Sequence, residues 1–301
     1  MPFVSRHRLA LVLVFVTPAL WVVNYLVART APGVIEPHLL ALLRWLMACL
    51  LFALPARQTL WAHRRQILVD WKHYLVLGAL GMWICGAWVY IGGRTTSAIN
   101  ISLIYAISPV LIVAVSALWL REHFRPLQAL GVALALAGML HVVLKGQWDA
   151  LTEVQFVPGD GWILAATLSW TVYSVLLKKW PSPLGAGARL AVISLVGVLV
   201  LLPFTVWEAW HNPLPILTLP GLGLALAAAL FPGFSAYYAY SVMQRELGAA
   251  RVSVVLYLGP IYTAVVAWLV LGEALHPFHA WGMALVLPGI YLVTRRQTAN
   301  A

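Results

Sequence analysis

Charged side chains are scarce in this sequence of 301 residues: only 9% are Asp, Glu, Lys or Arg, whereas 62% are hydrophobic. Soluble domains carry about 25% charged residues. The chain therefore lacks the polar surface that a soluble domain needs, which excludes a Rossmann domain, a kinase or a nucleic-acid module. The composition indicates an integral membrane protein.

Cysteine is almost absent, and the two present, Cys49 and Cys85, lie in apolar stretches without the spacing of a metal site. The sequence also has no zinc-binding His-Glu-x-x-His motif, no phosphate-binding Walker loop and no pair of aspartates within an apolar stretch. The residues for metalloprotease, ATP-driven pump or aspartyl protease chemistry are therefore missing. We expect a protein that is not an enzyme and that holds no metal or other cofactor.

Long apolar runs fill most of the chain. Since a helix needs about 20 apolar residues to cross a bilayer, these runs predict ten transmembrane helices, at residues 9–28, 37–54, 73–91, 98–119, 127–144, 161–177, 190–207, 221–243, 252–271 and 278–294. Arg44 is the single charged residue within them. No Asp or Glu lies in these ranges to form a proton relay, which favours facilitated diffusion or exchange over proton-driven antiport.

The formal net charge of +10 is explained by orientation. Of the 19 Lys and Arg residues, Arg29, Arg94 and Lys145 fall on the outer side if the N-terminus is cytoplasmic, Arg44 lies in a span, and all the others fall on the inner side. Cytoplasmic loops of membrane proteins carry such an excess of basic residues. We therefore predict a multi-pass protein with both termini in the cytoplasm and no nucleic-acid partner.

The chain contains an internal repeat. Residues 98–143 align with residues 249–294 at a constant shift of 151 residues, and the identical pairs include Ser102 and Ser253, Pro109 and Pro260, Glu122 and Glu273, Gly131 and Gly282, and Gly138 and Gly289. Shared hydrophobicity alone does not produce matched Pro, Glu and Gly residues. The sequence thus predicts two homologous units, a first repeat in residues 1–150 and a second in residues 151–301.

Each unit holds five predicted helices, an odd number, so the second copy must cross the membrane in the opposite sense. Inverted repeats are typical of secondary transporters, whose substrate site lies near the midplane between the halves. We therefore expect two inverted five-helix repeats around a central cavity. An inverted repeat kept for packing alone, or one that serves a channel, is the alternative.

The motifs of the repeat resemble those of a known family. The stretch from Thr96 to Pro109, the hairpin residues Leu120-Arg121-Glu122 and Leu271-Gly272-Glu273, and the opening motif Leu43-Arg44-Trp45 are similar to the EamA type of the drug/metabolite transporter superfamily. The likeness covers nearly the whole chain, with Arg121 standing where the family usually has Gly. It implies ten helices around a central cavity and export of small metabolites, often amino acids, from the bacterial cytoplasm.

The many aromatic residues are similar to those of YddG-type exporters of aromatic amino acids. In that type an aromatic residue is expected immediately before the proline that Pro109 matches, whereas this chain has Ser108. The substrate, its range, the coupling ion and the oligomeric state (monomer or homodimer) are therefore left open by the sequence.

Aromatic and polar residues share helix faces near mid-depth, where an unsatisfied polar group costs several kcal/mol. Such walls suit a small solute with an apolar or cationic part and a polar end. The candidate substrate-binding residues are Trp21, Asn24, Trp83, Tyr90, Asn100, Tyr105, Trp170, Tyr173, Tyr238 and Tyr257. For each aromatic residue, ordinary core packing is the competing interpretation.

Arg44 joins these candidates as the lone intramembrane charge, able to hold a substrate carboxylate through a bidentate pair. It could instead extend to the membrane surface or hydrogen-bond backbone carbonyls. Pro109 and Pro260 are hinge candidates for alternating access, with packing tolerance as the alternative. Glu122 and Glu273 are expected to cap the helices that follow them.

The sequence thus predicts a secondary transporter of the bacterial inner membrane that exports amino acids, aromatic or of broad range, or related metabolites by alternating access. A multidrug or organic-cation exporter of the same fold is the second hypothesis. A lipid-handling membrane protein is the third, and it would require a polar groove open to the bilayer.

Overall fold

The computed structural model describes residues 6–96, 101, 104–105, 107–121, 125–153, 155–212, 217–262, 265 and 276–294. Every regular element in these ranges is a helix, which confirms the all-α prediction. The longer helices are α1 (Arg6–Thr30), α2 (Pro37–Ala62), α7 (Ser108–Leu120), α8 (Pro126–Val143), α9 (Pro158–Lys179), α10 (Ala186–His211) and α15 (Pro277–Thr294). Short elements include α3 (Arg64–Val69), α13 (Ala249–Ser253) and the 3₁₀ segments η2 (Trp148–Glu153) and η4 (Val254–Leu258).

Two further spans are interrupted near their middle by π-helical turns. The first runs through α4 (Trp71–Gly78), the π-helix η1 (Ala79–Ile84) and α5 (Cys85–Gly92). The second runs through α11 (Leu219–Ala228), the π-helix η3 (Ala229–Ala236) and α12 (Tyr237–Leu247). The repeat shift of 151 residues carries residues 79–84 onto residues 230–235, which lie within η3. Both copies therefore contain the same irregularity at the same place.

Eight of the helices in the described residues are long and apolar enough to cross a membrane, and two shorter apolar helices, Ser108–Leu120 and Ala249–Tyr262, occupy the places of the predicted fourth and ninth spans. A multi-pass helical membrane protein is thereby confirmed. The number ten stays a prediction, because the described ranges hold only parts of these two spans.

Proline marks the start of several spans. Pro37, Pro126 and Pro158 occupy the first turn of α2, α8 and α9, where the missing N–H costs no hydrogen bond. The predicted capping residues Glu122 and Glu273 lie outside the described residues. At the start of α8, the backbone N–H of Arg125 donates to Gln128 Oε1 at 3.1 Å. The side chain of Gln128 therefore accepts the hydrogen bond of a backbone N–H that has no partner within the helix.

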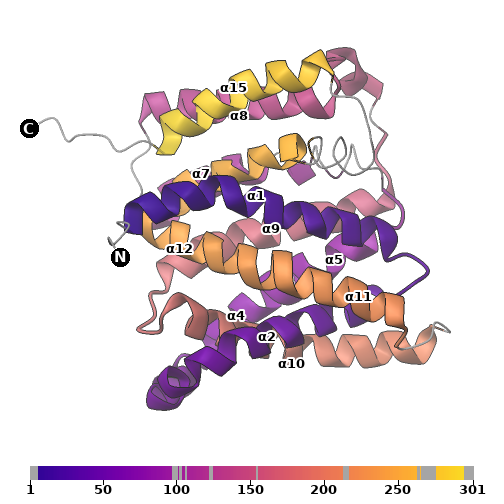
Figure 1. The fold of residues 1–301 in the computed structure, drawn as a ribbon, viewed down its shortest axis with the longest axis vertical. Helices are drawn as coiled ribbons and strands as arrows, with labels where there is room; N and C mark the ends of the chain where they lie inside the picture. The colour runs from indigo at the N-terminus through magenta and orange to yellow at the C-terminus, as the bar shows by residue number, and fades with distance from the viewer. Residues whose placement is uncertain are drawn as a thin grey trace, which may run out of the picture.

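Helices α8 and α15 lie side by side at one edge of the molecule, and α2 and α10 at the opposite edge, with α1, α9 and α12 between them (Figure 1). A Cβ added to Gly131 would lie 2.7 Å from Gly289 O, and one added to Gly138 would lie 2.6 Å from Gly282 O. Pairing 131 with 289 and 138 with 282 requires antiparallel helices. The repeat shift of 151 residues carries Gly131 onto Gly282 and Gly138 onto Gly289. The two contacts are therefore equivalent, as expected for two inverted copies.

The remaining contacts follow the same relation. Helix α1 packs on η3 and α12, and α9 packs on η1 and α5, so the first helix of each repeat lies against the π-interrupted span of the other. Helices α2 and α10, both of 26 residues, pack along each other. The centre of the molecule is therefore built from helices of both repeats.

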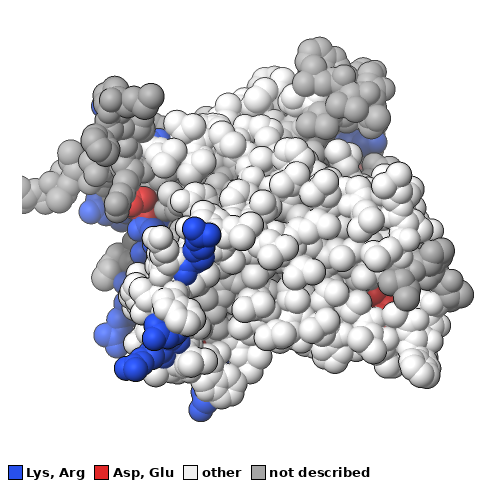
Figure 2. All heavy atoms as spheres, turned by 60° about the horizontal axis from the view of Figure 1, so that its bottom comes forward, with Lys and Arg blue, Asp and Glu red and all other residues white. Residues whose placement is uncertain are grey.

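Apart from the buried Arg44, the charged residues that the structure describes lie in the connections or toward the ends of the helices. Lys and Arg gather on the side where α1 begins and α15 ends, and the broad middle of the molecule is free of charge on the face in view (Figures 1 and 2). This is the distribution that the positive-inside rule describes. The predicted cytoplasmic position of the termini stays a prediction.

Helix α10 continues past residue 207 to His211 and so includes Glu208, which is only 5% exposed. Its carboxylate accepts hydrogen bonds from the backbone N–H groups of His38 and Leu39 at the start of α2, and His38 Nδ1 lies 2.8 Å from Glu208 Oε1. An acidic group thus joins α2 to α10 near the end of the span.

Candidate substrate site

Arg44 is held by side chains from two neighbouring helices. Its guanidinium is part of a residue only 4% exposed, and Nη1 donates to Asn24 Oδ1 of α1 and to the Tyr90 hydroxyl of α5, both at 3.1 Å. The Tyr90 hydroxyl in turn donates to Asn24 Oδ1 at 2.7 Å. These three candidate residues come from three different helices, and the structure brings them into one hydrogen-bonded triad.

The charge of Arg44 has no counter-ion in the part of the chain that the structure describes, where the ion pairs are His38–Glu208, His73–Asp70 and Arg94–Glu36. Its Nε also lacks a hydrogen-bond partner there. Its Cζ lies 4.7 Å from the centre of the Trp45 ring, which supplies a cation–π contact. A buried guanidinium with a free donor and no carboxylate is suited to receive an anionic group.

Arg44 also reaches the second repeat. A Cβ added to Gly233, in the π-helix η3, would lie 3.5 Å from both Cγ and Nε of Arg44. The absence of a side chain at this glycine allows the η3 backbone to approach the guanidinium. Nε therefore faces the boundary between the two repeats.

An aromatic cluster lies at the same boundary and is centred on Trp170 of α9. The Trp170 ring centre lies 5.8 Å from that of Trp21, 5.5 Å from Tyr173, 5.5 Å from Tyr237 and 5.0 Å from Tyr240. Because these rings contact one another directly, they fill the space between α1, α9 and α12 in this conformation. A solute must displace some of them to enter.

Trp45 connects this cluster to Arg44. Its ring centre lies 4.8 Å from that of Tyr237, in an edge-to-face arrangement, and the same ring contacts the Arg44 guanidinium. The Tyr237 hydroxyl donates to Gly81 O, 3.1 Å away in the π-helix η1. The charged triad, the aromatic cluster and both π-helical segments are therefore one continuous contact network.

Several polar atoms in this network are buried without a hydrogen-bond partner among the described residues: Arg44 Nε, Trp45 Nε1, Trp170 Nε1 and the Tyr173 hydroxyl. In folded proteins more than about 90% of buried polar groups are paired. These four unpaired groups near the boundary of the two repeats are therefore available to donate hydrogen bonds to a ligand.

The next candidate residues are Trp83, Tyr105, Tyr257 and Asn100. Trp83 stacks on Phe204 of α10, with ring centres 4.1 Å apart. Tyr257 is fully buried in η4, and Tyr105 is half-buried. Asn100 lies outside the described residues.

Tyr238 points away from the aromatic cluster. This candidate residue is 45% exposed, and Phe231, seven residues earlier on the same helix face, is 44% exposed. Its neighbours Tyr237 and Tyr240, which were not singled out, are buried and contact Trp170. The helix face that carries Phe231 and Tyr238 therefore points outward.

Pro109 and Pro260 also have defined places. Pro109 is buried in the first turn of α7, and its carbonyl lies 3.5 Å from Ser253 Oγ of α13. Pro260 is half-buried, two residues after η4. Pro109 therefore lies where α7 of the first repeat contacts α13 of the second.

These features define the class of the molecule: a multi-pass helical membrane protein with two repeats and a buried polar and aromatic site between them, which is the architecture of a secondary transporter. The model of the EamA-like transporter family matches residues 8–144 and 157–295, one match for each repeat. The chain belongs to this family of the drug/metabolite transporter superfamily, and it is a membrane transporter.

Individual relatives agree with this membership. An uncharacterized transporter of Archaeoglobus fulgidus is 27% identical over 97% of this chain and 99% of its own length. The S-adenosylmethionine/S-adenosylhomocysteine transporter of Chlamydia trachomatis serovar L2 is 24% identical over 95% of this chain and 89% of its own. A solved crystal structure with 20% sequence identity has a TM-score of 0.75 and covers 95% of this chain and 97% of that chain, which shows the same fold.

Proposed function

We propose that this protein exports amino acids or closely related metabolites from the bacterial cytoplasm across the inner membrane. Residues 1–150 and 151–301 form the two halves, and both termini are cytoplasmic. The observation that carries the proposal is the buried Arg44, which lacks a carboxylate partner among the described residues and lies beside an aromatic cluster at the boundary of the repeats.

The substrate carboxylate binds Arg44 in this proposal. Nη1 is already held by Asn24 and Tyr90, so the guanidinium is oriented before the substrate arrives, and the free Nε contributes a further donor. A preorganised donor loses little conformational entropy on binding. The aromatic faces of Trp21, Trp170 and Tyr240 accept the side chain or the ammonium group.

The Chlamydia relative supports a substrate of this chemistry. By its name that protein transports S-adenosylmethionine and S-adenosylhomocysteine. Both compounds carry an amino-acid carboxylate and an aromatic ring, the two groups that Arg44 and the aromatic cluster suit. We propose that this chain recognises its substrate by the amino-acid part, which both compounds share.

Transport follows alternating access between the halves, with Pro109 in α7 and Pro260, two residues after η4, as hinges at equivalent positions of the two repeats. The matched π-helices η1 and η3 are a second pair of sites where the helices can bend, since π-turns interrupt the regular hydrogen bonding of a helix. In η1, carbonyls accept side-chain hydrogen bonds instead: Leu80 O from Ser169 and Gly81 O from Tyr237. Such bonds can exchange partners as the halves move.

The test is counterflow of labelled amino acids in liposomes that contain the purified protein. Phe, Thr and a panel of other amino acids should include at least one substrate, whose flux falls at least about tenfold in Arg44→Gln, as loss of one charge-assisted contact predicts. Correctly folded protein that moves no amino acid would refute the proposal.

An organic-cation exporter is the second candidate, favoured by the ring cluster of Trp21, Trp170, Tyr237 and Tyr240, because aromatic faces bind quaternary ammonium groups. A labelled organic cation in the same liposomes separates the two. Cation flux that amino acids do not inhibit would favour this candidate over the first.

A further inference from the structure

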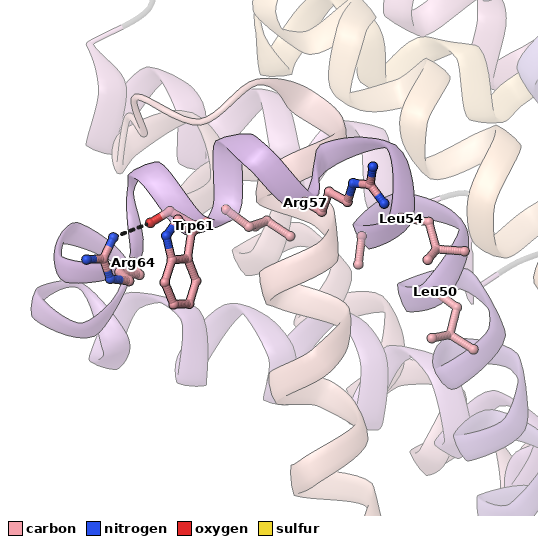
Figure 3. A pocket seen from close by; sticks show the side chains of 7 residues that line it. Leu50, Leu54, Arg57, Trp61 and Arg64 are labelled. Atoms are coloured by element: carbon pink, nitrogen blue, oxygen red, sulfur yellow. Dashed lines mark hydrogen bonds between the residues drawn. The ribbon is translucent and has the colours of Figure 1, made fainter.

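A groove lies on the outer surface of the molecule, far along α2 from Arg44. It has a volume of about 430 Å³, and its apolar wall includes Leu50, Ala53 and Leu54. Figure 3 shows the α2 ribbon changing direction between Leu54 and Trp61, the stretch that contains Pro55. A proline inside a helix removes a backbone hydrogen bond and bends it, and this bend makes one helical stripe concave.

Two arginines lie along the groove, Arg57 next to Leu54 and Arg64 beyond Trp61 (Figure 3). Arg57 and Arg64 line it together with Trp61, which is 70% exposed. Arg64 Nη1 donates to Trp61 O at 2.9 Å, and Arg64 Cζ lies 4.6 Å from the centre of the Trp61 ring. Neither arginine has a carboxylate partner among the described residues, and Arg57 has no hydrogen-bond partner there. The groove thus combines an apolar wall with two unneutralised positive charges.

The length of α2 places the change from leucine to arginine side chains along the groove at the membrane surface. At 1.5 Å per residue, about 20 residues from Pro37 span the hydrocarbon core of about 30 Å, which puts its edge close to Arg57. Leu50 and Leu54 then face acyl chains, while Trp61 and Arg64 lie at headgroup depth. Trp and Arg are the residues that membrane interfaces favour.

We infer that this groove binds one anionic phospholipid, with an acyl chain along Leu50, Ala53 and Leu54 and its phosphate beside Arg57 and Arg64. Basic pockets at the membrane surface recognise anionic headgroups in this way. The leaflet is the cytoplasmic one if the orientation proposed above holds. The site is separate from the substrate site, and no step of transport is needed to observe it.

A second copy of the chain fits the groove poorly. A two-fold contact places the same patch on both sides, so Arg57 and Arg64 would face their own equivalents. Four guanidinium groups would then meet without a carboxylate from the residues that line the groove. A single molecule with an apolar chain and a negative head is complementary to both ends at once.

Native mass spectrometry of the full-length protein tests the inference. Detergent-solubilised protein is titrated with phosphatidylglycerol or with phosphatidylcholine of the same acyl chains. We expect one phosphatidylglycerol adduct at concentrations where phosphatidylcholine gives none. In the variant Arg57→Gln/Arg64→Gln this adduct weakens about 30-fold, the effect of two arginines near an anionic headgroup.

The matched control is Arg65→Gln/Lys72→Gln, which removes the same charge from the same region outside the groove and should keep the adduct. Arg57→Lys/Arg64→Lys keeps the charge and should retain most of the binding. Equal binding of the two lipids, or equal losses in the groove and control variants, overturns the inference. So does a dimer that forms through the groove, detected by disulfide cross-linking of Leu54→Cys, in place of the lipid adduct.

Discussion

Replacement of Glu208 by Ala should weaken the junction between α2 and α10. The carboxylate accepts three hydrogen bonds: from His38 N at 2.9 Å, from Leu39 N at 3.2 Å and from His38 Nδ1 at 2.8 Å. Since a carboxylate only accepts, Nδ1 carries the proton in this contact. Glu208 therefore caps the first turn of α2 from another helix and also orients its histidine.

The size of the effect follows from these contacts. A hydrogen bond to a charged group contributes about 1.5–3 kcal/mol, and the loss of one partner from a buried pair costs about 3–5 kcal/mol. Because water can reach some freed donors at a helix end, we expect the lower end, about 3 kcal/mol for Glu208→Ala. Glu208→Gln keeps one acceptor oxygen and should lose about half as much.

Thermal unfolding in detergent measures this loss, at one scan rate for all variants because unfolding of membrane proteins is often irreversible. At about 2 °C per kcal/mol for a large chain, Glu208→Ala should melt about 6 °C lower. Glu153, exposed in η2, gives the control, and Glu153→Ala should stay within about 1 °C of the wild type.

The double variant His38→Ala/Glu208→Ala should lose less than the sum of the two single losses, because both remove the same contact. A Glu208→Ala protein that melts with the wild type, or strictly additive losses, would show that the junction contributes no stability.

Three further predictions concern the centre and the edge of the molecule. Arg44→Lys keeps the charge but loses the planar donor fork, so amino-acid counterflow should fall at least about tenfold, and wild-type flux would remove Arg44 from the site. Tyr237→Phe removes the hydrogen bond to Gly81 O and should lower stability by about 1 kcal/mol; an unchanged melting temperature would contradict that contact. Gly138→Val inserts atoms into the contact with Gly282 and should cost at least about 1–3 kcal/mol, whereas Gly223→Ala, which meets open space, should leave stability equal or slightly higher.

Some of the candidate site followed from the sequence because single residues were exceptional for their surroundings. Arg44 is the one charge in a predicted span, and Asn24 and Tyr90 are polar in apolar helices. Their joining into a triad did not follow, because Asn24 and Tyr90 lie 20 and 46 residues from Arg44 in the chain. Only the packing of α1, α2 and α5 decides that they meet.

The direction of each helix face was harder to predict. In a soluble protein the apolar stripe of a helix marks the core, but lipid is as apolar as a protein interior, so both faces of a membrane helix can be apolar. Tyr237, Tyr238 and Tyr240 therefore look alike in the sequence. Packing against Trp170 selects Tyr237 and Tyr240 and leaves Tyr238 at the surface.

Residue order was enough to predict the membrane class, the approximate spans and the two repeats, because bilayer thickness sets the length of an apolar run and a repeat can be read directly from the sequence. The tertiary structure alone decided which aromatic faces meet, that Glu208 caps α2, and where both π-helices contact the site. These depend on contacts between residues distant in the chain, and no local pattern records them. The scarcity of charge identifies the protein as a membrane protein. It also leaves most helices without a polar face, so the sequence does not show which face of each helix packs inward.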